Sequence, residues 1–374
     1  MQSEWQIFNA DSKTRVIITS NLPGDEWLER LKNQNYRVDI YRGSDVMNRD
    51  ALMKALQGDT HAVLGQLTES WDKELLTKLA KAGGKVYCNY AVGFDNVDTD
   101  AATANKIAVG NTPGVLTETT AELAVALSFA AARRIVEADE FMRAGKFQGW
   151  RPNLFLGELL HGKTLGLIGA GRIGSAYARM MARGHEMNVL YFNRSRNESL
   201  ENEINAYGKY LAIHGRESVS CRKVQSLDEL LSAADVLSIH VSLNEDSSHL
   251  IGQPELERMK PNAVLVNTSR GPVIDEEALV QHCRDYPEFK VGLDVFEDEP
   301  EMKPGLAELP NVVLAPHIGS ATGWTRKNMS KLAALNIIGV LNDYPLWEES
   351  DINPFLTDHP PEAIPSLVNP AVVK

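Results

Sequence analysis

The sequence has few cysteines, no long apolar run and no excess of positive charge. Its three cysteines, Cys88, Cys221 and Cys283, are scattered through 374 residues. This excludes a disulfide scaffold and a cysteine-based metal site, and it predicts a reduced compartment. No stretch approaches the roughly 18 apolar residues of a membrane helix, residues 1–15 lack a signal-peptide core, and the ending NPAVVK is not a Ser-Lys-Leu address. We therefore expect a cytoplasmic protein without a membrane segment.

The charge balance narrows the possible partners. A formal net charge of −12 argues against nucleic acids and anionic membrane surfaces. It does not exclude an anionic substrate, because a few local cations suffice to bind one. A hydrophobic content of 43% and a charged content of 24% are typical of a globular protein, and the length predicts two domains. No metal is expected.

Residues 163–196 have the pattern of a nucleotide-binding unit. An apolar strand is predicted at 164–168, a helix at 175–183 and a second strand at 188–192. Between the first strand and the helix lies a GxGxxG motif, in which the first glycine allows a tight turn, the second a close approach of phosphate, and the third close packing of helix on strand. An ordinary turn is the alternative, but the flanking elements favour a dinucleotide site. The motif comprises Gly169, Gly171, Arg172, Ile173 and Gly174.

The first part of the chain also alternates strands with helices. Strands are predicted at 14–19, 36–41, 61–65 and 86–89, and helices at 25–34, 49–57 and 72–82. This alternation indicates a parallel sheet, here without a glycine motif. The last strand leads into a glycine turn at 90–98. From the residues alone, this segment is either a plain turn or a cradle of N–H groups for a carboxylate at Val92 and Gly93.

Two segments connect or interrupt the sheets. Residues 116–145 are rich in alanine and predict one long helix that links the domains. Residues 197–225 are polar and predict a surface insertion with some helix around 200–210. Trp150, which lies between these segments, is most simply a packing residue.

Four more strands, at 235–241, 263–267, 291–295 and 312–315, would complete a six-stranded doubly wound sheet. Polar residues follow three of them, and ligands bind at this carboxyl edge of a parallel sheet. Each residue alone could be an ordinary surface group. Together they predict a site in which an arginine, a carboxylate and a histidine meet beside the glycine turn. The residues are Thr268, Ser269 and Arg270, then Asp294 with Glu297, Asp298 and Glu299, and finally His317 and Gly319.

Several motifs resemble one family over nearly the whole chain. NYAVGFDNVD, NTPGVLTETTAELA, GKTLGLIGAGRIG, LVNTSRGPVIDEEALV, GLDVFEDEP and APHIGSA are similar to those of the D-isomer-specific 2-hydroxyacid dehydrogenases, most of all to the plant hydroxypyruvate reductases (glycerate dehydrogenases). The resemblance implies an α/β fold in which a Rossmann-type doubly wound parallel sheet (119–321) is inserted into a flavodoxin-like substrate domain (1–118 and 322–374). It also implies a homodimer built largely on the 116–145 segment and its neighbours.

The resemblance assigns roles to individual residues. Arg270 would grip the substrate carboxylate and polarise the keto group, a task that suits a planar guanidinium. His317 would be the general acid, and Glu299 would orient it, although the sequence alone does not separate Glu299 from Glu297 and Asp298. The resemblance also favours the backbone N–H groups of Val92 and Gly93 as donors to the substrate carboxylate. Asp294 would face the nicotinamide amide, with Thr120, Thr268, Ser269 and Gly319 near the cofactor, and Trp150 would reach the partner subunit's site.

The implied reaction is reduction of hydroxypyruvate to D-glycerate, and of glyoxylate to glycolate, with a nicotinamide cofactor. Another D-2-hydroxy acid is an alternative substrate. The 57 residues after His317 (318–374) leave no room for the regulatory domain of phosphoglycerate dehydrogenases, and Gly319-Ser320 disfavours formate dehydrogenase. A dinucleotide-sensing co-repressor of the same fold is a different kind of alternative, disfavoured by the acidic charge.

The choice of cofactor depends on the end of the second strand in the glycine unit. An NAD site has an acidic residue there, which bonds the ribose 2′-hydroxyl, and the plant enzymes carry aspartate. This chain has Asn193, followed by Arg194, Ser195 and Arg196. Arginines can bind the 2′-phosphate of NADP, and asparagine does not repel it. The sequence therefore favours NADP(H), with NAD(H) possible because asparagine can still bond a hydroxyl.

Overall fold

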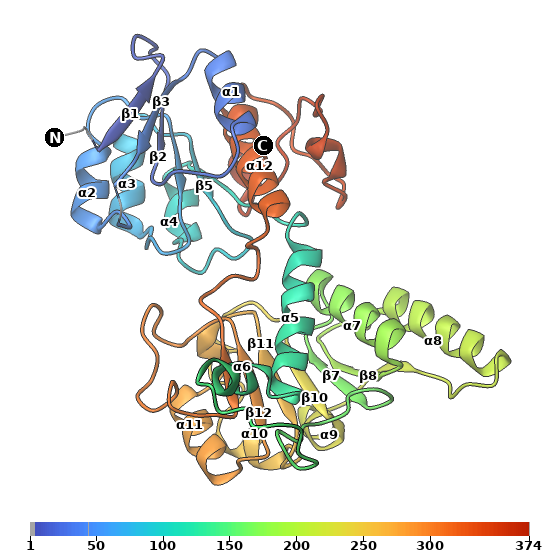
Figure 1. Ribbon diagram of the computed structural model, residues 1–374. Helices are drawn as coiled ribbons and strands as arrows, with labels where there is room; N and C mark the ends of the chain where they lie inside the picture. Colours follow the sequence, from blue (N-terminus) through green and yellow to red (C-terminus); the bar gives the residue numbers. More distant parts are fainter. Residues whose placement is uncertain (1–3, 44, 374) are drawn as a thin grey trace. The chain divides into compact units, whose positions relative to one another are not determined.

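The computed structural model describes residues 4–43 and 45–373. The chain divides into two compact units, Met1–Leu116 with Ser320–Lys374, and Thr117–Gly319. Each unit is a β-sheet, parallel except for β1 at one edge, with helices on both faces (Figure 1), which confirms the predicted α/β class. The family resemblance implies junctions after residues 118 and 321, which lie two residues later in each case.

The first unit contains a six-stranded sheet in the order β1-β3-β2-β4-β5-β6. Apart from β1, which pairs antiparallel with β3, its strands are parallel in the flavodoxin-like order. The strands are β1 (Trp5–Phe8), β2 (Arg15–Ile18), β3 (Arg37–Tyr41), β4 (Ala62–Gly65), β5 (Val86–Asn89) and β6 (Ala108–Gly110). The two edge strands, β1 and β6, are not predicted from the sequence. β1 buries none of its residues and β6 has only three, so neither shows the long buried run that marks a central strand.

Helices cover both faces of this sheet (Figure 1). One face carries α1 (Glu26–Asn33) and the long α12 (Gly323–Leu341), and the other carries α2 (Arg49–Ala55), α3 (Lys73–Lys81) and α4 (Thr99–Ala104). The C-terminal segment, with the short 3-10 helices η2 (Asn353–Leu356) and η3 (Pro370–Val373), returns to the edge of the sheet. There Leu367 pairs with Gly110 of β6, so the exposed edge of β6 is covered.

The second unit contains a seven-stranded parallel sheet in the order β13-β12-β11-β10-β7-β8-β9. The strands are β7 (Thr164–Ile168), β8 (Asn188–Phe192), β9 (Cys221–Lys223), β10 (Val236–Ile239), β11 (Val264–Asn267), β12 (Lys290–Leu293) and β13 (Val312–Leu314). The prediction of six strands was wrong because β9, with the polar sequence CRK, has no apolar pattern. Strand order reverses between β7 and β10, and ligands of doubly wound sheets bind at that point.

The predicted single helix at 116–145 is two helices, α5 (Thr117–Ala132) and α6 (Ile135–Arg143). Arg134 between them has a left-handed backbone (φ 54°), which a continuing α-helix does not allow. The carbonyl of Ala132 instead accepts the N–H of Glu158 at 2.9 Å. The supposed insertion at 197–225 is likewise ordered, as α8 (Glu198–Ile213) followed by β9.

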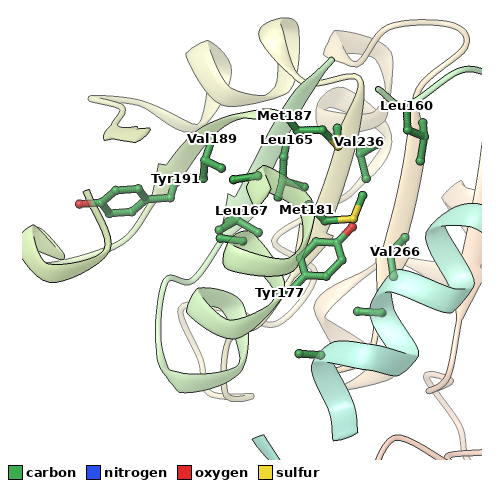
Figure 2. Packing of buried hydrophobic residues seen from close by; sticks show 14 of the residues in the cluster. Leu160, Leu165, Leu167, Tyr177, Met181, Met187, Val189, Tyr191, Val236 and Val266 are labelled. Atoms are coloured by element: carbon green, nitrogen blue, oxygen red, sulfur yellow. The ribbon is translucent and has the colours of Figure 1, made fainter. Parts of the chain in front are cut away.

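The remaining helices of this unit are α7 (Arg172–His185), α9 (Leu227–Ala233), α10 (Gln253–Arg258), α11 (Glu276–Asp285) and the short η1 (Gly271–Val273). Figure 2 shows the core between sheet and helices, where apolar side chains of four strands face Tyr177 and Met181 of α7. The strand residues are Leu165, Leu167, Val189, Val236 and Val266. Within the described part of the chain, no helix is both long and apolar enough to cross a membrane.

Candidate active site

The three glycines of the turn after β7 occupy positions with different structural requirements. Gly169 has φ +93°, and a Cβ there would lie 2.5 Å from the carbonyl oxygen of His240. A Cβ at Gly174 would lie 2.2 Å from the carbonyl oxygen of Gly169. At Gly171, by contrast, a Cβ would meet no described atom within 4 Å. Two glycines are therefore required by packing, whereas the third leaves the backbone open to an approaching group.

Helix α7 begins directly at this open glycine. Its first residues are Arg172 and Ile173, its first turn contains no acidic residue, and its N-cap residue, Gly171, provides no side-chain cap. The first N–H groups of a helix lack partners inside it and carry partial positive charge. The turn and the helix start together thus have the backbone required to bind a phosphate.

The loop after β8 is hydrogen-bonded to the same turn. Asn197 donates from Nδ2 to the carbonyl oxygen of Ala170 at 2.8 Å and to the hydroxyl of Ser175 at 3.1 Å. Its Oδ1 accepts the N–H of Leu200 at 3.1 Å and so caps α8. The sequence analysis missed Asn197, although an asparagine directly before a helix pattern is an N-cap signal. Residues 193–196 are consequently held beside the glycine turn.

The two arginines of this loop have different surroundings. Arg196 is paired with the buried carboxylate of Glu201 at 2.5 Å, and this contact lowers the pKa of that carboxyl. The exposed Arg194 forms no side-chain hydrogen bond or ion pair with the described residues. Asn193 donates to the carbonyl oxygen of Ser195 at 3.0 Å. Arg194 is therefore the more available cation.

At the end of β11, the buried Asn267 shapes the following turn. Its Oδ1 accepts the N–H and the hydroxyl of Ser269 at 3.0 and 2.7 Å, and its Nδ2 donates to the carbonyl oxygen of Arg270 at 2.8 Å. The hydroxyl of Thr268 is buried without a hydrogen-bond partner in the described part of the chain. Such a group is suited to bonding a ligand. Asn267 was missed, since asparagine inside an apolar run gives no separate signal.

Asp294, at the end of β12, holds the loop after β13. It is 1% exposed, and its two carboxylate oxygens accept the N–H groups of Ile318 and Gly319, each at 2.7 Å. Its carbonyl oxygen accepts the N–H of His317 at 2.9 Å, while the hydroxyl of Thr120 bonds the carbonyl of Gly319 at 3.1 Å. Burial raises the pKa of Asp294. These bonds keep His317 in a left-handed conformation, with φ 53°.

His317 and Glu299 form a direct pair. Nδ1 of His317 lies 2.9 Å from Oε2 of Glu299, both side chains are about one-third exposed, and Oε1 of Glu299 accepts the N–H of Phe296. Burial acts to raise the pKa of Glu299, but the hydrogen bond and charge of His317 outweigh it and lower that pKa. A carboxylate on one ring nitrogen leaves the other available to give or accept a proton. The pair is a suitable acid–base group.

The other two acidic residues of this turn have different partners. Glu297 lies 2.9 Å from Nε2 of His249, and Asp298 pairs with Lys303 at 2.7 Å. The geometry thus separates Glu299 from its neighbours, which the residues alone could not do. Both His–Glu pairs depend on side-chain directions in an irregular turn. These directions cannot be predicted from the periodicity of the sequence.

In the first unit, Val92 and Gly93 lie in the loop after β5. Nδ2 of Asn111 donates to the carbonyl oxygen of Val92 at 2.9 Å, and Nδ2 of Asn89 donates to that of Gly93 at 2.8 Å. Trp150, in the second unit, is not a packing residue within the chain, because its side chain is 83% exposed.

Comparison with known proteins is consistent with this geometry. Residues 125–319 match the model of the NAD binding domain of D-isomer specific 2-hydroxyacid dehydrogenases. The chain is 52% identical to glycerate dehydrogenase from Cucumis sativus (97% of this chain and 96% of the relative) and 50% identical to the peroxisomal glycerate dehydrogenase HPR of Arabidopsis thaliana (97% and 95%). An NADPH-dependent glyoxylate/hydroxypyruvate reductase from Sinorhizobium meliloti, solved with NADP and malonate, has a similar structure, with a TM-score of 0.72, 28% identity and coverage of 89% and 95%.

The pairing of His317 with Glu299 predicts a titration change that is independent of turnover. In His317→Ala, the largest effect that opposes burial of Glu299 is removed, so the pKa of its carboxyl should rise. NMR titration of ¹³C-labelled glutamate measures this, with Glu299→Gln to assign the signal. His249→Ala is the matched control, because it removes the partner of Glu297 instead. An unchanged pKa of Glu299 in His317→Ala would contradict the pairing.

Proposed function

The chain belongs to the D-isomer specific 2-hydroxyacid dehydrogenase family, and on this premise we propose that it reduces hydroxypyruvate to D-glycerate and glyoxylate to glycolate. It is an oxidoreductase with a domain for a nicotinamide dinucleotide. The observation that carries the proposal is the His317–Glu299 pair, which lies in the unit that also contains the open glycine turn. The relatives named above for glycerate, glyoxylate and hydroxypyruvate support the substrate class.

The residues at the carboxyl edge fit a dinucleotide. The open backbone at Gly171 and the uncapped start of α7 suit its pyrophosphate. The unpartnered hydroxyl of Thr268 suits a polar group of the cofactor, and we assign Thr120, Ser269, Asp294 and Gly319 to the same neighbourhood. When bound, the reduced nicotinamide supplies the hydride.

The chain's own residues supply binding and the proton. Arg270 binds the carboxylate of the 2-keto acid through a charge-assisted fork and polarises the keto group. His317, protonated on its free ring nitrogen, donates a proton to the carbonyl oxygen, which becomes the hydroxyl of the product. Glu299 stabilises the imidazolium before the transfer and keeps the ring oriented afterwards. In the reverse direction, neutral His317 accepts the hydroxyl proton.

Replacing Arg270 tests the carboxylate assignment. Arg270→Ala should lower kcat/KM for hydroxypyruvate about a hundredfold, since losing a charge-assisted contact costs roughly 3 kcal/mol. Cofactor affinity should change little. Arg222→Ala is the matched control, because this exposed arginine pairs, among the described residues, only with Glu229 at the surface. If Arg270→Ala keeps near-normal kcat/KM, the carboxylate is bound elsewhere.

The proposed function and its proton donor are tested by following hydroxypyruvate turnover as a function of pH. Reduction requires protonated His317, so kcat/KM should fall as the pH rises. Glu299→Gln should move this fall to lower pH, because a neutral amide no longer favours the imidazolium. His317→Ala should lose most turnover and still bind cofactor. Absence of turnover in the wild type would refute the function, and an unmoved profile in Glu299→Gln would refute the pairing in catalysis.

We propose NADPH as the preferred cofactor. Asn193, at the end of β8, stands where an acid would repel a 2′-phosphate, and the exposed Arg194 beside it can bind that phosphate. Ser195 offers a further donor. Arg196 contributes less, because its guanidinium already pairs with Glu201. The reductase from Sinorhizobium meliloti, which is NADPH-dependent, supports the use of this cofactor in a similar fold.

The cofactor assignment predicts that substitutions in the loop after β8 change the preference from NADPH to NADH. The wild type should prefer NADPH over NADH in kcat/KM by roughly tenfold to a hundredfold, the value of one good phosphate contact. The double variant Asn193→Asp/Arg194→Ala should prefer NADH. Arg196→Ala is the matched comparison and should change the ratio less. A wild type that prefers NADH would overturn the assignment.

We also propose that the protein is a homodimer. Helix α6 buries none of its residues within the chain, and it and the following segment expose an unusual number of large apolar side chains. These are Ile135, Val136, Met142, Phe147, Trp150, Leu156 and Leu159. Such a surface is typical of a subunit interface.

Light scattering with size-exclusion chromatography tests this arrangement. The wild type should have the mass of two chains, and Val136→Glu/Phe147→Glu should have the mass of one, because a buried unpaired charge is costly at an apolar interface. Ile213→Glu is the control, since Ile213 is also exposed but lies at the end of α8. A monomeric wild type would contradict the proposal.

We propose the cytoplasm as the compartment. Cys88, Cys221 and Cys283 are all free and buried, which suits a reducing environment. The Arabidopsis relative is named peroxisomal. Cell fractionation distinguishes the two compartments, and peroxisomal enrichment would correct the assignment.

A further inference from the structure

We propose that Asn89 and Asn111 are positioning residues, which turn the N–H groups of Val92, Gly93 and Phe94 to one side so that they bind the carboxylate of the 2-keto acid. The inference rests on the proposed function and extends it. It adds Phe94 as a third donor, and it explains why the loop after β5 has its conformation.

Three consecutive carbonyl groups of this loop are bound by donors from the interior of the first unit. The carbonyl oxygen of Ala91 accepts the N–H of Thr112 at 2.8 Å. Those of Val92 and Gly93 accept the side-chain amides of Asn111 at 2.9 Å and Asn89 at 2.8 Å. All three donor residues are buried. The carbonyl groups of residues 91, 92 and 93 are thus directed toward the interior.

The N–H directions follow from the geometry of the peptide bond. In a trans peptide, the N–H of one residue points opposite to the carbonyl of the residue before it. The only cis peptide in the described part of the chain is Glu299–Pro300. The N–H groups of Val92, Gly93 and Phe94 therefore point away from the interior. None of them donates a hydrogen bond to another described residue.

Both asparagines are themselves fixed. Oδ1 of Asn89 accepts the hydroxyl of Tyr87 at 3.0 Å, and its Nδ2 also donates to Oδ1 of Asn96 at 2.9 Å. Oδ1 of Asn111 accepts the hydroxyl of Ser366 at 2.6 Å. With their oxygens engaged, the amides can present only their NH₂ groups to the loop.

The C-terminal segment takes part in this arrangement. Ser366 bonds Asn111, and its N–H donates to Oδ1 of Asn336 on α12, while Nδ2 of Asn336 donates to the carbonyl of Asn111. The end of the chain is thus connected to the Val92 carbonyl through one asparagine. This gives Ser366 a part in substrate binding, whereas Leu367 covers the edge of β6.

Successive N–H groups on one side of a bend form a concave anion site. A carboxylate matches it, because the site offers several neutral donors and a carboxylate accepts bonds at both oxygens. An aspartate in place of either asparagine could not donate to the loop carbonyl. Side-chain size would be kept, but the peptide would be released and the site would lose its order.

The experiment compares Asn89→Asp and Asn111→Asp with the wild type. We expect KM for hydroxypyruvate and the inhibition constant of oxalate each to rise at least tenfold, with kcat and the KM of NADPH nearly unchanged. Ser366→Ala is a milder variant that keeps both amides and should give a smaller rise. Oxalate binding to the enzyme with NADP⁺ is also measured by calorimetry, which does not depend on turnover.

Asn369→Asp is the matched control. Asn369 bonds the carbonyl of Ile107 at 2.9 Å and the N–H of Val109 at 2.7 Å, so it holds the same strand β6 without touching residues 91–94. It should lower the melting temperature and leave oxalate binding intact. Folded Asn89→Asp and Asn111→Asp with wild-type oxalate binding would overturn the inference, as would an equal loss in Asn369→Asp. Oxalate binding without hydroxypyruvate turnover in the wild type would refute the proposed function alone.

Discussion

Hydrogen bonding to the buried carboxylate of Asp294 is the interaction on which the candidate site of the second unit depends. It accepts two N–H groups of the loop after β13, and its own carbonyl accepts the N–H of His317. A left-handed histidine costs free energy, and it persists only where its surroundings determine it. The raised pKa of Asp294 shows the cost of burying this group. Without it, the loop would lose the bonds that direct His317 toward Glu299.

Buried or half-buried polar side chains set the conformation of the other candidate site loops in the same manner. Asn267 shapes the turn that carries Arg270, Asn197 connects the loop after β8 to the glycine turn, and Asn89 with Asn111 orients the loop after β5. An unpaired polar group in the interior is costly, so a satisfied one specifies one backbone path. In our proposal, the groups that meet ligands are backbone N–H groups and a few charged side chains, and asparagines and one aspartate hold them in place.

The sequence predicts the parts of the molecule that have a period or a motif. The central strands, the glycine turn and the polar residues after β11, β12 and β13 all follow from local patterns. Edge strands such as β1 and β9 are not predicted, because they are short and half-exposed. The break at Arg134 is not predicted either, because it is accompanied by a hydrogen bond from Glu158, which is distant in sequence. The choice of Glu299 over Glu297 depends on side-chain directions in an irregular turn. The roles of the supporting asparagines are also not predicted, since many of their hydrogen-bond partners are distant in the chain.

The configuration of the product tests the central claim most directly. Hydroxypyruvate is reduced with NADPH carrying deuterium at the transferable position, and the glycerate is separated on a chiral column and analysed by mass spectrometry. Our account predicts a single enantiomer with one deuterium on C2, because His317 and Arg270 present one face of the keto group for reduction. Membership of the D-isomer specific family predicts that this enantiomer is D-glycerate. L-glycerate, a racemic product or no deuterium at C2 would contradict it.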